Sequence, residues 1–394
     1  MTSRHLDAQA RGARVSRRAA IGTGLAAVGA SLLPASVRAQ ASGEPIPIGC
    51  SAALTAQFAQ NGAWMKNGVS LAAKQINDKG GVKGRPIQLF FEDDQGPNPT
   101  AASNAVIKLL TQSKVVAMIG PHFTPAILPV EPILQQHSVP ALTGATGPVV
   151  TQQHNDWVFR VRLNDTTGAV LLVKYVLQNL GWKKIGIDYV NTAFGQSGID
   201  AVKAALAAQG ITPIATQTHL DSTKDFTAQL LTFQQAGVDG IIVWTDDQPS
   251  GLLVKQLKTL GMKYGIAGST TFSQPPFLSL AGDAADGTYS VTDFVQSNTN
   301  PAIAAWKPVY HAVYGEDPEL YATTYYDAMN LIAFAASQAS SITGPGIRDA
   351  LTKIKDRPGI MTTYSWSPEG NMVHSGLIAV AKGTVPTVVA VIKE

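Results

Sequence analysis

Three consecutive carboxylates, Glu92, Asp93 and Asp94, are the residues of this sequence whose types and spacing come nearest to an acid–base centre. They follow the apolar run "PIQLFF" and precede Gly96-Pro97. General acid–base catalysis needs a second group close by with a displaced pKa, and the neighbouring sequence supplies none. We therefore interpret the triplet as loop anchors and solvated ends at the carboxyl end of a strand.

Other motifs of enzymes and metal sites are missing from the sequence. It contains no G-x-x-x-x-G-K-[ST] phosphate loop and no H-E-x-x-H helix. The stretch "GQSGI" at 195–199 lacks the second glycine that a nucleophile elbow requires. The seven His residues are scattered without the spacing of metal ligands. We expect no enzyme activity, no cofactor and no metal. A hydrolase whose catalytic residues come together only in the fold is the alternative.

The single cysteine, Cys50, excludes an internal disulfide and a thiolate metal cage. The letters "PIGC" at 47–50 invite a lipoprotein interpretation. However, Cys50 lies well past the apolar N-terminal run, beyond Glu44 and two prolines, and inside what reads as the first strand. We therefore expect a buried thiol.

The N-terminal residues 1–39 differ in character from the rest of the chain. An Arg-rich head precedes "AAIGTGLAAVGASLL" (19–33), a run too short and too Gly-rich to span a bilayer, and "VRA" (37–39) offers small residues for cleavage. We interpret 1–39 as an export signal. The pair Arg17-Arg18 resembles a twin-arginine signal, with a Sec-type signal as the alternative. Without 1–39 the chain has 24 basic and 26 acidic residues, a net charge of −2, and no basic footprint for nucleic acid.

The whole sequence is 45% hydrophobic and long enough for two cores. After residue 42 the chain alternates short β-rich runs with amphipathic helical stretches. This alternation is typical of parallel sheets with crossover helices, and it begins again near residue 163. We predict an α/β fold of two Rossmann-like lobes that bind a ligand at the carboxyl ends of their strands. Strands are expected at 46–53, 86–93, 115–120, 139–142, 184–190, 211–216, 240–244 and 264–268. Helices are expected at 62–78, 98–112, 124–137, 164–180, 195–209, 225–237, 249–261, 299–314 and 319–340. After residue 340 we expect β-rich runs to the end.

Three stretches occur in an order and spacing that resemble one family. They are "KNGVSLAAKQINDKGGVKGRPIQLFFEDD" (66–94), "VVAMIGPHFTPAILPVEPILQQHSVPALTGATGP" (115–148) and "KDF" (224–226). From about residue 45 onward the chain resembles the periplasmic substrate-binding proteins of ABC importers, above all the branched-chain amino-acid and amide-binding class. The resemblance implies two lobes that are joined by three crossover strands and close over a ligand, with the acidic triplet as scaffold. Lobe one would be 44–162 plus 294–366, and lobe two 163–293 plus 367–394.

In lobe one the resemblance assigns four ligand contacts. Asn61 falls where an aromatic residue often sits, and Thr124 takes the place of a serine hydroxyl. Gly144 would offer a backbone carbonyl, and Thr146 a backbone N–H and a hydroxyl. The alternatives are that Thr124 and Thr146 only cap helices or turns, and that Asn61 is a helix N-cap before Gly62.

In lobe two the resemblance assigns three more contacts. Phe194 keeps the ring of a family tyrosine without its hydroxyl, and Asp246 falls at a second tyrosine position. Thr270 falls where amino-acid binders carry the Glu that holds the ligand's ammonium group. The alternatives are that Phe194 belongs to the core, and that Asp246 is solvated or caps a helix beginning near Pro249.

The residue types fit one half of an amino-acid site directly. Hydroxyls and backbone N–H groups at helix ends suit a carboxylate or an amide oxygen. A buried α-ammonium group needs a carboxylate partner; Thr270 cannot supply it, whereas Asp246 could from a neighbouring strand end. The ligand thus stays open between a branched-chain or other hydrophobic amino acid, an organic acid with an uncharged tail (aromatic acids included) and a small amide. His122 is left outside the predicted site, and Trp64 and Trp244 are expected in the core.

Composition and pattern alone predict an exported, two-lobed α/β protein, and the resemblance implies a monomeric solute-binding protein of the periplasm. By resemblance, it would capture a small molecule by lobe closure and deliver it to an ABC permease in the inner membrane. It would bind no nucleic acid, and it would need no cofactor because the ligand is released unchanged. A ligand sensor on the same fold, signalling to a separate receptor or regulator, is the alternative.

Overall fold

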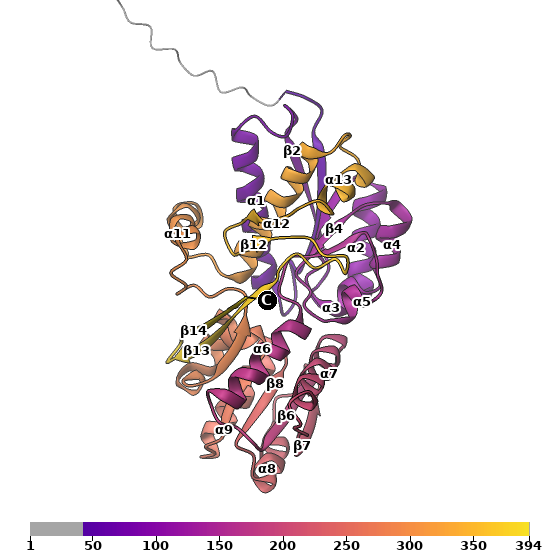
Figure 1. Cartoon of the computed structure of the whole chain (residues 1–394). Helices are drawn as coiled ribbons and strands as arrows, with labels where there is room; N and C mark the ends of the chain where they lie inside the picture. The colour runs from indigo at the N-terminus through magenta and orange to yellow at the C-terminus, as the bar shows by residue number, and fades with distance from the viewer. Residues whose placement is uncertain (1–41, 394) are drawn as a thin grey trace, which may run out of the picture. The chain divides into compact units, whose positions relative to one another are not determined.

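Two β-sheets organise the part of the chain that the computed structural model describes, residues 42–393 (Figure 1). The first sheet is entirely parallel. Its strands lie in the order β2 (Ile87–Asp93), β1 (Ile46–Ala52), β3 (Ala117–Ile119), β4 (Ala141–Thr143) and β5 (Val158–Arg160). The predicted export signal at 1–39 lies outside the described residues.

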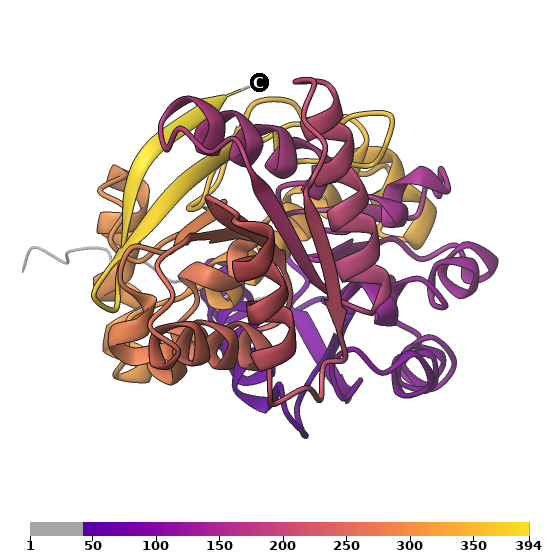
Figure 2. The same cartoon turned by 90° about the horizontal axis from the view of Figure 1, so that it is seen from below.

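The second sheet is parallel except for a hairpin at one edge, where β13 pairs antiparallel with both of its neighbours. Figure 2 shows this hairpin in yellow at the edge of the other strands. The order is β14 (Val385–Lys393), β13 (Ser375–Lys382), β10 (Tyr289–Thr292), β9 (Gly265–Gly268), β8 (Gly240–Trp244), β6 (Ile185–Val190) and β7 (Ala215–His219). The two sheets confirm the predicted α/β fold of two Rossmann-like lobes.

Helices connect the parallel strands, as the right-handed crossover of parallel sheets requires. With the first sheet come α1 (Ala59–Asp78), α2 (Pro99–Thr111), α3 (Thr124–Ile127), α4 (Glu131–His137) and α5 (Val149–Gln152). With the second come α6 (Asp165–Gln178), α7 (Ala193–Ala207), α8 (Thr227–Ala236), α9 (Asp247–Thr259), the 3-10 turns η1 (Thr270–Ser273) and η2 (Gly282–Ala285), and α10 (Pro275–Ala281). The chain then forms α11 (Pro301–Tyr314), α12 (Leu320–Gln338), α13 (Gly344–Leu351) and the short strands β11 (Arg357–Pro358) and β12 (Thr363–Tyr364).

The core of the first lobe depends on a close crossing of α1 and α12. Trp64, Val69 and Ala72 of α1 are buried, at the spacing of one helix face. Gly68 lies between them, and a Cβ added there would sit 2.1 Å from the carbonyl oxygen of Ala322. Glycine therefore sets how closely the two helices approach.

The acidic triplet anchors the loop that follows β2, as the sequence analysis predicted. Asp94 is buried and accepts hydrogen bonds from Ser51 Oγ (3.0 Å) and the N–H of Gly96 (2.9 Å). Asp93 accepts one from the N–H of Leu54 at 2.9 Å and another from the hydroxyl of Thr55. Glu92 forms an exposed ion pair with Lys108. These bonds fix the loop next to β1 and leave the triplet no catalytic partner.

The predicted positions of Cys50 and the two tryptophans are confirmed. Cys50 is buried in β1, and burial raises the pKa of its thiol. Trp64 and Trp244 are buried as well, and the indole N–H of Trp244 donates to Asp165 at 3.0 Å.

Several predicted elements were wrong in detail. The helix expected over 124–137 is two helices, because Pro129 has no N–H to continue the first one. The strand expected at 211–216 begins only at Ala215, which pairs with Gly186. The region after 340 contains a helix, α13, where only β-rich runs were expected. Thr343 accepts a hydrogen bond from the N–H of Gly346 and so caps this helix despite its Gly-Pro-Gly start.

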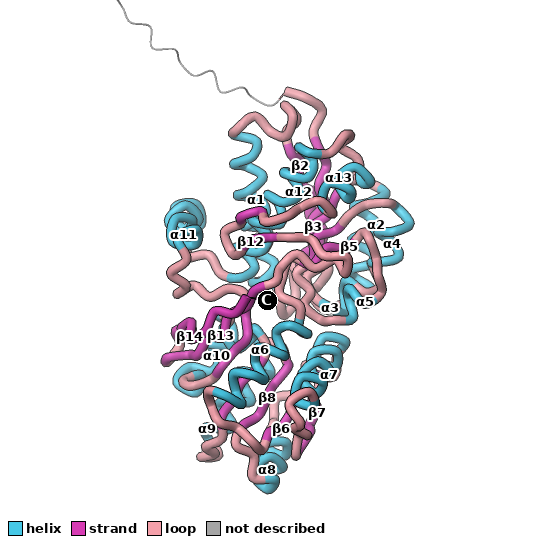
Figure 3. Tube along the Cα trace, in the orientation of Figure 1, coloured by secondary structure: helices cyan, strands magenta, loops and turns pink. Residues whose placement is uncertain are grey.

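The chain passes between the two sheets after β5, after β10 and after β12 (Figure 3). A buried ion pair joins the first two of these passages. Arg162 Nη2 and Nε lie 2.7 and 2.9 Å from the Asp293 carboxylate oxygens, and Asp293 also accepts from the N–H of Leu163 at 3.0 Å. Burial lowers the pKa of Arg162, but the charge and the hydrogen bonds of Asp293, together with Tyr321 and Tyr325, raise it above its usual value. The residues at which each lobe begins and ends stay a prediction.

Replacing Asp293 by Ala should lower the stability of the folded chain by about 3–5 kcal/mol, because the buried Arg162 guanidinium would lose its counter-charge. The measurement is urea unfolding of the purified chain. The double variant Arg162→Met/Asp293→Leu is the control, since it removes both charges and should cost less than the single substitution. Equal losses in the two variants would contradict a charge-pairing role.

Candidate ligand-binding site

One cavity is lined by residues of both lobes, at the carboxyl ends of their strands. Open α/β sheets bind ligands at this end. The lobe-one wall includes Thr124, Gly144 and Thr146, and the lobe-two wall includes Phe194, Asp246 and Thr270. The structure thus brings together all the predicted site residues except Asn61.

The lobe-one wall is a loop whose shape is fixed by Arg160. This buried side chain donates from Nε to the carbonyl of Ala145 at 2.9 Å and from Nη2 to that of Gly147 at 2.6 Å. A Cβ at Gly144 would lie 2.6 Å from both His122 Nδ1 and the hydroxyl of Tyr325, so only glycine fits there. The loop therefore offers backbone rather than side-chain groups at this point.

Two threonines of this wall already have protein partners. Thr124 begins α3, and its hydroxyl oxygen accepts from the N–H of Gly147 at 3.2 Å, which leaves its proton for an acceptor. The Thr146 side chain forms a hydrogen bond with Asp165. Burial raises the pKa of Asp165 to about 6, and the bonds from Trp244 and Thr146 oppose that rise.

The lobe-two wall carries an aromatic ring and two carboxylates. Phe194 lies in the first turn of α7, partly exposed toward the cavity. Asp246 is at the N-cap position of α9, but its side chain makes no capping hydrogen bond. Because α9 begins two residues before the predicted start, Asp247 also lies at the cavity. Sequence analysis missed this second carboxylate.

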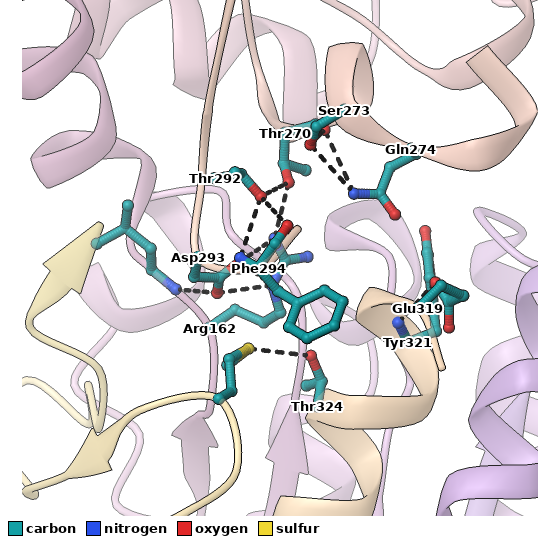
Figure 4. Close-up of polar contacts among 12 residues, drawn as sticks. Arg162, Thr270, Ser273, Gln274, Thr292, Asp293, Phe294, Glu319, Tyr321 and Thr324 are labelled. Carbon is teal, nitrogen blue, oxygen red and sulfur yellow. Dashed lines mark hydrogen bonds and ion pairs between the residues drawn. The ribbon is translucent and has the colours of Figure 1, made fainter. Parts of the chain in front are cut away.

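Thr270 is held by neighbours within the protein, as Figure 4 shows. Its hydroxyl oxygen lies 2.7 Å from the hydroxyl of Thr292 and accepts from Arg162 Nη2 at 3.2 Å. A carboxylate at this position would face Arg162 directly. Thr270 instead keeps the Arg162–Asp293 pair undisturbed.

Asn61 does not line the cavity in the described structure. The helix α1 begins at Ala59 rather than at Gly62 and its N-cap residue is Phe58, so Asn61 lies inside the helix. Its side-chain amide faces Asp247 Oδ2 at 3.5 Å and forms a hydrogen bond with Tyr321. Asn61 therefore bridges lobe one to a lobe-two carboxylate.

Two aromatic residues that the prediction omitted, His122 and Tyr321, form part of the wall. Their ring centres are 4.2 Å apart, and His122 Nδ1 lies 2.7 Å from the hydroxyl of Tyr325. Burial, with Arg162 nearby, holds the pKa of His122 well below its usual range, so the imidazole is neutral. His122 thus contributes a polar but uncharged surface.

A chain of hydrogen-bonding groups is buried in lobe two. His219 Nδ1 is 2.9 Å from Asp188 and its Nε2 is 2.7 Å from the hydroxyl of Thr245. The order of groups is that of an acid, a base and a nucleophile. However, Asp188 and Thr245 are 0% exposed, and a nucleophile must reach its substrate. We interpret the chain as a buried link between the ends of β6, β7 and β8.

Within residues 42–393 no three His, Cys, Asp or Glu side chains gather in a way that could hold a metal ion. None of the helices there has the length and apolar character to cross a bilayer.

Comparison with known proteins finds relatives of this chain by sequence. A family model described as "periplasmic binding protein" matches residues 45–384. The Leu/Ile/Val-binding protein homolog 3 of Brucella melitensis is 28% identical over 85% of this chain and 90% of its own length. The Leu/Ile/Val-binding protein BraC3 of Rhizobium johnstonii is 32% identical over 66% of this chain and 71% of its own length.

Solved structures agree with the sequence relatives. The branched-chain amino-acid transporter substrate-binding protein LivJ of Streptococcus pneumoniae, solved with isoleucine, superposes with a TM-score of 0.80 at 25% identity. The match covers 89% of this chain and all of that structure. The family match over most of the sequence and the two-lobed fold with its shared cavity lead to one conclusion. This chain belongs to the periplasmic binding protein family.

Proposed function

We propose that this protein is the exported solute-binding component of an ABC importer and that it delivers a small molecule to a membrane permease. The observation that carries the proposal is the cavity lined from both lobes. A ligand held there touches both walls at once, so its binding favours the closed arrangement of the lobes over the open one. Family membership supports the same function.

The ligand is an amino acid with a branched-chain or other hydrophobic side chain, or a related small organic acid or amide. The names of the Brucella and Rhizobium relatives support the amino acid. The Thr124 hydroxyl and the backbone around Gly144 suit a carboxylate or amide oxygen. Phe194, Phe58 and Phe123 line the same cavity and suit an apolar side chain.

Binding without chemistry fits the cavity better than catalysis does. The side chains of Asp188, His219 and Thr245 are buried, and none of them lines the cavity. A sensor that passes lobe closure to a receptor is the second candidate. The importer is preferred, because the names of the relatives describe binding proteins and LivJ is described as part of a transporter.

Ligand binding should stabilise the chain and close the lobes. At about 1,000 times its dissociation constant a ligand adds about 4 kcal/mol, which raises the melting temperature by several degrees. Small-angle scattering should show a smaller radius of gyration in the same sample.

Phe194→Ala should weaken binding about 10-fold or more, because an apolar contact is lost. Leu231→Ala, at an exposed position of α8, is the matched control. Equal losses in both variants would count against Phe194 as a contact.

The bound molecule should leave the protein unchanged. Ligand incubated with the purified chain for hours and released by unfolding should be recovered intact, in a one-to-one ratio to protein, by mass spectrometry. Steady conversion of the ligand, lost on Thr245→Val, would instead establish a hydrolase that uses the buried Asp188–His219–Thr245 chain.

Export through the twin-arginine route should depend on Arg17 and Arg18. Replacing both by Lys should keep the protein in the cytoplasm, because that route reads the arginine pair itself. Cell fractionation and N-terminal sequencing, with a mature start near residue 40, provide the measurement. Arg11→Lys/Arg14→Lys keeps the same charge and is the control. Unimpaired export of the Arg17/Arg18 variant would assign the signal to the Sec route.

A further inference from the structure

A second cavity, of about 380 Å³, adjoins the ligand cavity described above and has no part in the proposed function. It lies between α10, the turn of the β13–β14 hairpin at 384–386 and the stretch 294–297 that follows β10, and Glu319 at the start of α12 completes it. The hydroxyl of Ser297 donates to the carbonyl of Pro386 and so ties two of these segments together. The volume is within the range of small-molecule sites.

The floor of the second cavity is apolar and its rim is open to solvent. Leu278, Phe294 and Val295 line it and are each at most 6% exposed. Ser279 of α10 and Val385 of the hairpin also line it, and both are exposed. A molecule that enters past the rim therefore removes its apolar surface from water on the floor.

One polar group of the floor has no partner. Gln274 lines the second cavity and is only 3% exposed. Its Nε2 faces Ser273 Oγ at 3.4 Å and the carbonyl of Thr270 at 3.5 Å, whereas its Oε1 is buried without a hydrogen-bond partner within residues 42–393. Figure 4 shows this oxygen turned away from Ser273 and Thr270, on the side where Glu319 lies. A buried acceptor without a donor is unfavourable, so a donor from a bound molecule would be stabilised there.

The carboxyl group of Glu319 is an acceptor as well, and it is already used by the protein. Its Oε2 accepts from the N–H of Tyr321 at 2.8 Å and its Oε1 from the N–H of Ala322 at 2.6 Å, so it caps α12. Burial raises the pKa of Glu319 to about 8, and these two bonds oppose the rise. The carboxyl is therefore mostly uncharged at pH 7, and it lies at the positive end of the helix dipole. It offers no counter-charge to a cation.

We propose that the second cavity is a binding site for a small uncharged molecule that carries one hydroxyl or N–H donor on an apolar body. The apolar body would lie against Leu278, Phe294 and Val295, and the donor would bond to Gln274 Oε1. An anion would face two acceptor groups, and a cation would find no counter-charge. This molecule is not the transported solute, so the site goes beyond the proposed function. Gln274 also lines the ligand cavity, which places the second site directly beside it.

The test uses phenol as the probe, in isothermal titration of the purified chain. Phenol should bind about 10-fold more tightly than toluene and anisole, because these carry the same ring without a donor for the unpaired acceptor. Benzoate and benzylammonium should also bind more weakly than phenol, because the cavity compensates neither charge.

Substitutions then locate the bound phenol. Ser279→Trp adds a large ring at the rim of the second cavity and should weaken phenol binding about 10-fold or more. Asn104→Trp, at an exposed position of α2, is the matched control and should change nothing. Phe194 lines the ligand cavity but not the second one, so Phe194→Ala should leave phenol binding unchanged.

A substitution of Gln274 separates recognition from a structural role. Gln274→Met keeps the length of the side chain and removes the unpaired oxygen. It should raise the melting temperature of the ligand-free chain, because no buried acceptor is left unpaired, and it should make phenol and toluene bind equally. A purely structural Gln274 would instead give a lower melting temperature and an unchanged ratio of the two affinities.

Three results would overturn the second site. They are no binding of phenol, equal binding of phenol and toluene by the wild type, and phenol binding that is lost in Phe194→Ala but kept in Ser279→Trp. The last result would place phenol in the ligand cavity. The solute-binding function has its own test in the melting temperature and scattering with the transported solute, so its failure and that of the second site are distinguishable.

Discussion

The buried pair of Arg162 and Asp293 is the interaction on which the rest of the site depends. It ties together two of the passages between the sheets, and it lies in the wall of the cavity. Both charges are almost fully removed from water, so each is tolerable only because the other is present. The pair thereby uses up the positive charge of the cavity. The two other acidic groups of the wall, Asp246 and Asp247, are left without a cation among the described residues, and burial raises the pKa of both.

Arg160, two residues earlier and on the same face of the chain, has a different role. It donates to the carbonyls of Ala145 and Gly147, and its Nη1 donates to Asn371 at 2.9 Å. The first two bonds hold the loop whose backbone forms the lobe-one wall, and the third reaches the segment that leads to β13. Two arginines in one short stretch thus fix both the wall of the cavity and the connection between the sheets.

The sequence predicts the framework of this protein well and the partners inside its site poorly. Alternating β-rich and helical stretches reveal both sheets, because apolar periodicity is a local property. Thr124, Phe194 and Asp246 could be placed near the cavity through the family resemblance, which matches them to ligand-contacting loops. Asp247 was missed through an error of two residues in where α9 begins. The local sequence does not reveal the roles of Arg162 and Gln274. The role of Arg162 depends on its ion pair with Asp293, and that of Gln274 depends on its own unpaired side-chain oxygen. Only the tertiary structure shows either feature.

The distribution of polar groups explains why the cavity suits capture rather than chemistry. The groups in the order of a catalytic triad, which belong to β6, β7 and the residue after β8, are buried and do not line the cavity; His219 lies 2.9 Å from Asp188 and 2.7 Å from Thr245. The groups that line the cavity are open to a ligand. Asp246 and Asp247 are acceptors that the protein leaves incompletely paired. Incomplete pairing costs stability in the empty protein, and a ligand that supplies the missing donors recovers that cost on binding. The same groups that weaken the empty cavity therefore make its closure conditional on the right ligand.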